Sequence, residues 1–282
     1  MELLKSRCIL LLTIVLQLYC YRSLPDSNRK SEWIDLSSYH FDVDLPVNLF
    51  GPWELYWGKL YHPEDFRTGR VSKDEQFYTY FRPWTNQVKG NKKLPAQGFA
   101  TYRLRIKIPP SSSEKIYTVH FSHLFSASRL FINGKFIQEK GRVSENINEI
   151  AAIRTSSNVE FKVLGDEIEI ILHIANKDFY RGGPRGEFLL STREPMEKFK
   201  VKSIILEALA FGLIFGVAIY HFFIYLSNRK QKAFLYFSLL CLAFLVRIPI
   251  LNSKIYEYFV PIPSAHFIAN LLHYIDISSF LF

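Results

Sequence analysis

Cysteine is scarce in this sequence. The 282 residues include three, Cys8, Cys20 and Cys241, and each lies in an apolar run rather than in a polar domain. No CxxC pair and no Cys/His cluster with zinc spacing occurs, so neither a zinc site nor a disulfide framework is expected. Glycine-rich phosphate loops and nucleophile elbows are also absent. We therefore expect no metal and no cofactor.

Acidic residues are outnumbered by basic ones. The sequence holds 35 Lys and Arg against 26 Asp and Glu, a formal net charge of +9. A basic balance can indicate nucleic-acid binding, but several of these charges flank apolar segments, where they act as signals of membrane topology. We expect these basic residues to contact membrane lipid and not nucleic acid.

Long apolar runs fill the C-terminal part of the chain. Residues 204–226 are almost entirely apolar and long enough to cross a hydrocarbon core of about 30 Å as a helix. A second run covers 233–250 and a third starts at 263 and continues to 282. We expect these to be membrane helices 1 and 2 and the start of helix 3, joined by loops 227–232 and 251–262.

The N-terminus has the pattern of an export signal. Residues 1–20 combine a basic start with a short apolar core, which predicts a signal peptide or a signal anchor, and lipidation at Cys20 is a lesser alternative. Residues 21–44 are expected to be a flexible linker. Arg229, Lys230 and Lys232 place the first loop between spans in the cytoplasm. Residues 21–202 would then lie in the periplasm, on the outer side of a bacterial inner membrane.

Between these regions the sequence is rich in β-strand patterns. TYRLRIKI at 101–108 alternates apolar and basic residues, and Pro109-Pro110 is expected to end that strand. Arg129–Gln138 reads as a hairpin, with Asn133-Gly134 in a type I′ turn. Further strands are expected at 116–121, 167–174 and 187–191. Short strands without long helices predict an all-β jelly-roll sandwich over 45–200.

The order of these motifs resembles two known families. GFATYRLRIKIP, LFINGKFI and IEIILHIAN are similar to the galactose-binding-like jelly rolls of glycoside-hydrolase accessory domains. GPWELYWGKLYHPEDF, that strand series and IANKDFYRGGPRGEFLL, followed by apolar spans, resemble the bacterial seven-transmembrane receptors with diverse intracellular signalling modules. The resemblance implies an external jelly-roll sensor that binds carbohydrate-like ligands and drives a seven-helix bundle with a cytoplasmic output. This chain holds about two and a half spans and no output module, as a fragment of such a receptor would.

Aromatic and planar polar side chains are the candidates for ligand contact, because sugars stack on aromatic rings and bond to planar donors. Trp84 follows Pro83 in an expected loop, and Arg181 precedes two glycines. The remaining candidates are Asn176, Trp53 and Trp57. For the two WELYW tryptophans, alternation within a strand favours core packing over ligand contact.

Catalysis is not expected. A glycosidase needs two carboxylates held about 5–10 Å apart, and Glu54, Asp65, Asp74 and Glu75 lie in no recognisable setting. The chain is therefore interpreted as a non-enzymatic receptor. The alternatives are a membrane-anchored carbohydrate-binding or structural module without signalling, and an exported hydrolase with unrecognised acids.

Small and charged residues mark the expected contacts within the membrane bundle. Ala208, Gly212 and Gly216 recur every four residues, which lets another helix approach closely and permits a homodimer through the membrane helices. Glu207 and Arg247 lie near the outer ends of the first two spans and are predicted to pair. In the third run, the polar stripe of His266, Asn270, His273 and Asp276 is expected to face the bundle.

Overall fold

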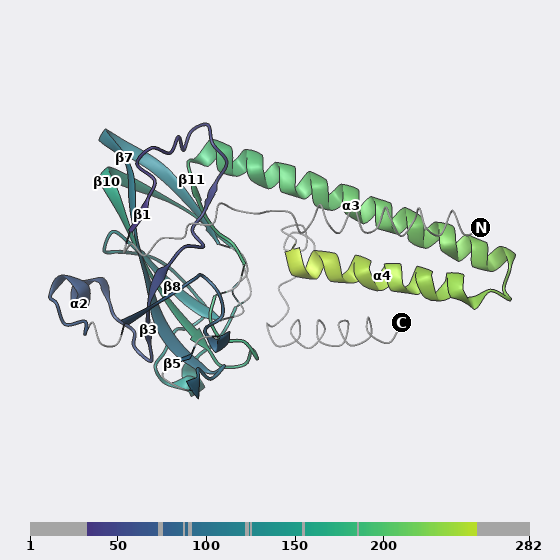
Figure 1. Cartoon of the computed structure of the whole chain (residues 1–282), viewed down its shortest axis with the longest axis horizontal. Helices are drawn as coiled ribbons and strands as arrows, with labels where there is room; N and C mark the ends of the chain where they lie inside the picture. Colours follow the sequence, from purple (N-terminus) through teal and green to yellow (C-terminus); the bar gives the residue numbers. More distant parts are fainter. Residues whose placement is uncertain are drawn as a thin grey trace.

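Two long neighbouring strands, β7 (Gly98–Phe121) and β10 (Ser157–Asn176), form the centre of the β domain. The computed structural model describes residues 33–252, apart from 73–75, 87, 90–91, 122–123, 125, 154–155 and 185. β7 and β10 run antiparallel along their whole length, and Figure 1 shows them crossing the domain from one end to the other. The other strands attach to their free edges.

Short strands share these edges and curl the sheet into a half-barrel. Along the free edge of β7 lie β3 (Trp53–Trp57), β1 (Trp33–Asp35) and β11 (Phe188–Ser191), and along that of β10 lies β8 (Ala127–Ile132). The described residues form one nine-stranded sheet, antiparallel except for β1 on β7, and a separate two-stranded sheet. The remaining strands are β2 (Val47–Asn48), β4 (Gln76–Thr79), β5 (Val88–Lys89), β6 (Lys92–Lys93) and β9 (Lys135–Lys140).

The strand predictions are confirmed in most places. Alternation in 101–108 puts Tyr102, Leu104 and Ile106 in the core, with the basic residues on the opposite face. The hairpin between β8 and β9 turns at Asn133 and Gly134, whose φ angles of 48° and 78° fit the expected type I′ turn. The domain is mostly β, as predicted, although its principal strands belong to one continuous sheet.

Two predictions about segment ends were wrong. Pro109 and Pro110 do not end the strand, because they fall between the pairs Lys107–Glu167 and Ser111–Gly165, where a register irregularity leaves no ladder hydrogen bond for them to donate. Residues 33–44 are not part of a flexible linker. The Phe41 ring lies in the core, edge-on to Tyr117 at 5.2 Å.

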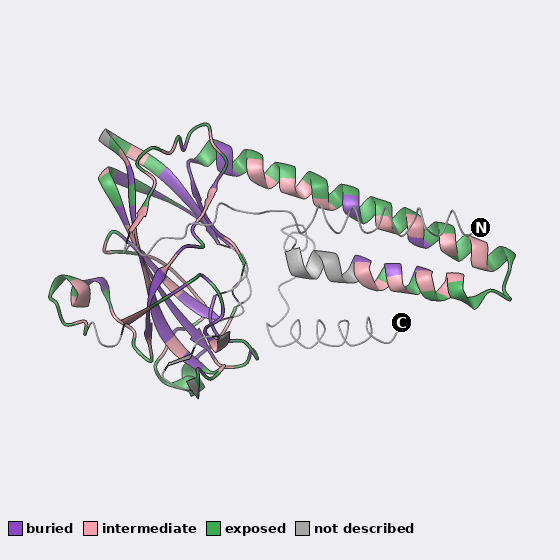
Figure 2. Cartoon of the chain, in the orientation of Figure 1, coloured by how far each residue is buried: buried purple, intermediate pink, exposed green. Residues whose placement is uncertain are grey.

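Helix α3 (Arg193–Ser227) leaves the sheet directly after β11, and α4 (Lys232–Asn252) returns beside it (Figure 1). By length and composition α3 is the one described helix able to cross a membrane, and Figure 2 shows it exposed along most of its surface. Both helices begin before the expected spans 204–226 and 233–250. The extra residues of α3 are held helical by pairs such as Glu194–Lys198 at i and i+4.

Candidate functional site

Asn176, at the end of β10, joins three segments at one end of the sheet. Its Nδ2 donates to the carbonyl oxygens of Ala96 and Phe179, both at 2.8 Å. The amide N–H of Phe179 donates back to Oδ1 at 3.3 Å, so the loop that starts at residue 177 turns on this side chain. Asn176 has no exposed surface. Its donors and acceptor are used within the protein, and the residue fixes the loop.

Trp84 connects two of the segments that Asn176 joins, through hydrogen bonds of its own. Its Nε1 donates to Pro95 O at 2.8 Å, and its backbone N–H donates to Gly182 O at 2.9 Å. The Trp57 ring packs edge-on against it, with centroids 4.8 Å apart. A Cβ on Gly182 would lie 2.0 Å from Ala96 O, so only glycine fits there. We call Trp84, Asn176, Gly182 and the carbonyls of Pro95 and Ala96 the clamp.

Trp53 lies apart from the clamp. Its ring packs in the core against Phe81 and Phe188, with centroids 5.2 Å away in each case, and Nε1 donates to Leu49 O at 2.8 Å. Trp53 and Trp84 have no exposed surface, so in this structure neither ring offers a face to a ligand. Of the five predicted ligand residues, Trp57, Trp84 and Asn176 form or contact the clamp, and Arg181 lies on the loop that the clamp holds.

Arg181 is the exposed member of the predicted set. Its guanidinium carbon lies 5.4 Å from the centroid of the Tyr180 ring, which is 62% exposed. A second arginine–tyrosine pair lies on the loop before Trp84, where the guanidinium carbon of Arg82 is 5.3 Å from the centroid of the Tyr80 ring. This pair was not predicted from the sequence. We call Tyr80, Arg82, Tyr180 and Arg181 the Tyr–Arg rim. The sequence signal is an arginine after an aromatic residue and before proline or glycine, as in YFRP and FYRGG.

The two loops of the rim touch through the clamp. Trp84 bonds to Gly182, and a Cβ on Gly183 would lie 3.1 Å from Pro83 Cα. Arg82 and Arg181 each directly precede one of these touching segments. Within the part of the chain that the structure describes, neither guanidinium has a carboxylate within ion-pair distance. The rim therefore presents two arginines that form no ion pair with any described residue.

The acids proposed for a hydrolase are arranged differently. Glu54 is 4% exposed and accepts hydrogen bonds from Arg103, Arg105 and Tyr56 at 2.9–3.2 Å. These hydrogen bonds engage both carboxylate oxygens of Glu54, so the residue ties β3 to β7. Asp65 caps the short helix α2 (Pro63–Arg67). Asp74 and Glu75 lie outside the described residues.

His173 is buried on the face of the sheet opposite the core. Its Nε2 lies 2.8 Å from Tyr61 O, and Nδ1 has no partner among the described residues. Burial lowers the pKa of His173 to about 4, with the Tyr61 hydrogen bond acting in the opposite direction. The neutral ring fastens the segment before α2 to the sheet. No group of three His, Cys, Asp or Glu side chains suited to a metal occurs in the described part.

The first turns of α3 are fixed to the sheet. Met196 is fully buried, and Arg193 Nε lies 3.5 Å from a carboxylate oxygen of Glu160 on β10. Lys200 donates to Asn158 Oδ1, which also lies 2.8 Å from Nδ1 of the buried His120. We call these residues of α3 the foot of the helix. Only Thr192 separates β11 from α3, and these contacts attach the start of α3 to β10.

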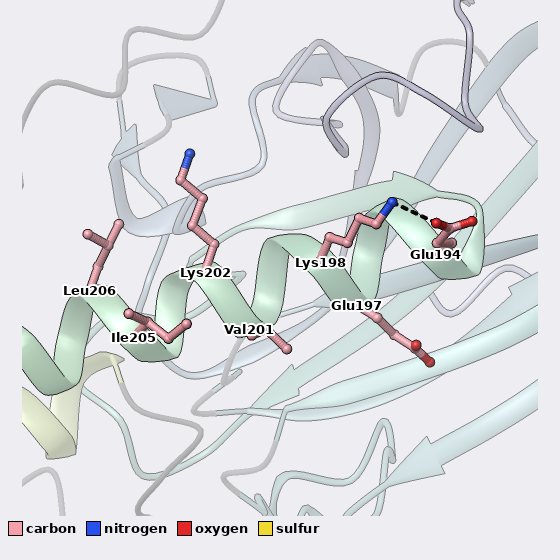
Figure 3. Close-up of a pocket in the computed structure, with 7 residues that line it drawn as sticks. All are labelled: Glu194, Glu197, Lys198, Val201, Lys202, Ile205 and Leu206. Atoms are coloured by element: carbon pink, nitrogen blue, oxygen red, sulfur yellow. Dashed lines mark ion pairs between the residues drawn. The ribbon is translucent and has the colours of Figure 1, made fainter.

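A shallow hollow lies along the foot (Figure 3). Its lining residues all belong to α3, and the Glu194–Lys198 pair at 2.6 Å closes one end of it. The lining side chains are Glu194, Glu197, Lys198, Val201, Lys202, Ile205 and Leu206. A groove built from one helix surface provides no convergent set of ligand groups, so we do not assign a site to it.

Helix α4 packs on the face of α3 opposite the small residues. Ser238 Oγ donates to Ala218 O at 2.9 Å, and the His221 ring packs against Phe237 at 4.5 Å. Ala208, Gly212 and Gly216 are exposed, so α4 is not the helix that approaches them. Glu207 is half-buried; the side chain of Arg247 lies outside the described residues, as do His266, Asn270, His273 and Asp276.

A known family matches the helical part of the chain. Residues 203–282 match the family described as 7TM diverse intracellular signalling. The resemblance to this family predicted from the sequence is confirmed over that region. The match of residues 203–282 and the apolar helix α3 together indicate a membrane protein, and the match favours a sensor.

The solved structures that resemble part of this chain include two beta-glucuronidases. They include a beta-glucuronidase of Ruminococcus gnavus, with 11% identity, a TM-score of 0.38, and coverage of 53% of this chain and 28% of that one. A beta-glucuronidase of Faecalibacterium prausnitzii shows 9% identity and a TM-score of 0.38, over 53% of this chain and 32% of that one. This chain spans less than a third of either structure. Comparison with curated protein sequences gives no match.

Proposed function

We propose that this chain is a membrane receptor whose β domain binds a small carbohydrate-like ligand and transmits binding to a seven-helix bundle. In this proposal the β domain is a galactose-binding-like jelly roll in the periplasm, and the Tyr–Arg rim is its ligand surface. The family match of residues 203–282 supports the receptor class.

The single observation that carries the proposal is the short connection along the chain from the rim to α3. The loop that bears Arg181 leads into β11, and β11 leads into α3, which continues as one helix from Arg193 to Ser227. A helix rises about 1.5 Å per residue, so α3 spans about 50 Å. A ligand that displaces the loop acts on a strand that is joined directly to this helix.

The foot of α3 makes that path rigid. Met196, the Arg193–Glu160 pair and the Lys200–Asn158 hydrogen bond attach the helix to the strands it leaves. A ligand can shift the bundle only by binding one arrangement of the foot better than another. Receptors that signal in this way need a stiff connection, whereas a carbohydrate module that serves only as an anchor does not.

The experiment follows ligand binding at the far end of α3. Full-length chain in detergent micelles, with its three cysteines replaced by alanine, carries Ser227→Cys labelled with an environment-sensitive fluorophore. We expect a sugar from a glycan panel to bind and to change the fluorescence with the same concentration dependence as binding. Met196→Ala should keep the binding and lose most of the fluorescence change, while Lys198→Ala, an exposed control, should keep both.

Three other outcomes separate the alternatives. Binding without a fluorescence change in the parent protein favours the anchored module. Cleavage of a bound oligosaccharide favours the exported hydrolase. Absence of binding across neutral and charged sugars removes the ligand class and leaves the family assignment of residues 203–282 in place.

A further inference from the structure

The two arginines of the rim differ from the arginines on the sheet strands in the partners that the described residues offer them. Arg103, Arg105 and Arg129 each contact a glutamate at 2.6–3.2 Å. Arg82 and Arg181 are exposed, lie on touching loops, and have no carboxylate partner within the described residues. Exposed guanidinium groups on two touching loops, without a carboxylate partner among the described residues, can donate hydrogen bonds to an anion.

Each of these guanidinium groups is held in place by an aromatic ring. Arg82 lies over Tyr80, whose ring also stacks on Phe50 with centroids 5.3 Å apart and an interplanar angle of 18°. Arg181 lies over Tyr180, which contacts Phe179 at 4.6 Å. A guanidinium that rests on a ring keeps its plane while its N–H edges stay available for a carboxylate. Less side-chain entropy is then lost when an anion binds.

The clamp fixes the loops that carry the two arginines. The Trp84 and Asn176 hydrogen bonds are buried and satisfied, and Gly182 has no room for a side chain. The clamp therefore fixes the backbone beside the rim, while Tyr180 is 62% exposed and Phe50, which stacks on Tyr80, is 42% exposed. Exposed ring surface beside guanidinium edges suits a ligand with an apolar C–H face and an anionic group.

We infer that the Tyr–Arg rim selects a sugar that carries an acidic group, such as a uronic acid, over its neutral counterpart. The inference rests on the proposed function and narrows its ligand class. The carboxylate of the sugar accepts hydrogen bonds from Arg82 and Arg181, while the sugar ring packs on the exposed aromatic surface. A neutral sugar leaves both guanidinium groups without a partner, so it binds more weakly.

The test compares sugars that differ only in charge. Full-length protein in a neutral detergent is titrated calorimetrically with oligomers of glucuronate, galacturonate and mannuronate, each against its methyl ester. We expect at least one acid to bind about tenfold or more tightly than its ester, with the preference falling as salt rises. Arg82→Gln and Arg181→Gln should each remove most of that preference. Arg70→Gln is the matched control, because Arg70 is 73% exposed and lies beside Asp65, away from the rim.

The result also separates the inference from the function on which it rests. Equal binding of acid and ester overturns the acidic-sugar inference and leaves a carbohydrate receptor. No binding by any sugar of either panel overturns both. An anionic lipid headgroup offers the same chemistry, so glycerophosphoglycerol is titrated in parallel. Binding of this headgroup in place of the sugars, with loss in Arg181→Gln, overturns the sugar as the source of the anion.

Discussion

At the scale of single residues, His173 joins the sheet to the segment that covers it. The Nε2–Tyr61 O hydrogen bond at 2.8 Å and the Thr101 hydroxyl, which donates to Lys59 O at 2.9 Å, hold that segment on β7 and β10. Burial favours the neutral imidazole, because a charged ring would be buried with Nδ1–H unpaired among the described residues. His173 therefore ties the stability of the β domain to pH.

We predict that acid destabilises the β domain through His173. The pKa is about 4 in the folded protein and near 6.5 when unfolded, so the unfolded chain binds a proton first as pH falls. The stability is fully present at neutral pH and is lost between about pH 6.5 and 4. From pH 7 to 5 the loss should be about 2 kcal/mol, measured as a fall in the fluorescence melting temperature of the full chain in detergent.

His173→Gln keeps a donor for Tyr61 and removes the titration, so its melting temperature should change less between pH 7 and 5. His62→Gln is the control, since His62 is exposed and packs beside His173 with ring centroids 5.2 Å apart. If His173→Gln shows the same acid sensitivity as the parent protein, another group is responsible.

The clamp leaves no room for a side chain at Gly182. A methyl group there would lie 2.0 Å from Ala96 O and 2.5 Å from the Trp84 ring, and the backbone oxygen cannot move aside cheaply. We predict that Gly182→Ala costs about 1–3 kcal/mol of domain stability and weakens sugar binding. Gly69→Ala, with φ +70° and open space, should cost about 1 kcal/mol and leave binding unchanged. Wild-type stability of Gly182→Ala would mean that the clamp tolerates a side chain.

At the scale of elements, the positions of the strands could be predicted from the sequence, but the bulge in β10 could not. Alternation identifies 101–108 and 167–174 because one face is buried along each strand. Pro109-Pro110 reads as a stop in isolation, but β10 bulges beside it near Gly165, whose φ is +104°. A bulge depends on the partner strand, so one strand's sequence cannot reveal it. The early start of α3 was available from the Glu194–Lys198 and Arg193–Glu197 spacings.

The packing of α3 on α4 is the element-scale contact most sensitive to volume. Ala218 is 1% exposed and its carbonyl accepts from Ser238. We predict that Ala218→Leu separates the helices and lowers the temperature at which helical circular dichroism is lost in detergent. Ile219→Leu, one residue along on a 40% exposed position, should have little effect. Equal melting of both variants would place the stabilising contact of α3 elsewhere.

At the scale of the whole molecule, the candidate site depends on contacts that sequence spacing cannot show. Asn176 and Ala96 are 80 residues apart, and Trp84 meets Gly182 across a similar separation. Residue chemistry singled out Trp84, Asn176 and Arg181, but only the fold separates the buried clamp from the exposed rim. Arg82 was missed because its relation to Arg181 arises from the touching of two loops. The division into a β domain and apolar helices, in contrast, was visible in composition alone.

The membrane orientation is set by competing charges at the two ends of α3. Arg229, Lys230 and Lys232 follow its C-terminal end, while Lys198, Lys200 and Lys202 lie near its N-terminal end. Short loops between spans obey the positive-inside rule, whereas a long exported domain largely escapes it. We therefore predict that the loop 228–231 lies in the cytoplasm and the β domain in the periplasm.

Labelling with a membrane-impermeant maleimide checks this prediction in a cysteine-free background. Glu145→Cys, exposed on the β domain, should react in intact spheroplasts, and Asn228→Cys should react only after permeabilisation. Changing Arg229, Lys230 and Lys232 together to glutamine should produce a mixture of the two membrane orientations, because the charges that retain the loop are gone while Lys198, Lys200 and Lys202 remain. Reaction of Asn228→Cys from outside would place the rim in the cytoplasm, where it could not meet an external sugar. The sensor proposal would then fail even if the rim binds acidic sugars in detergent.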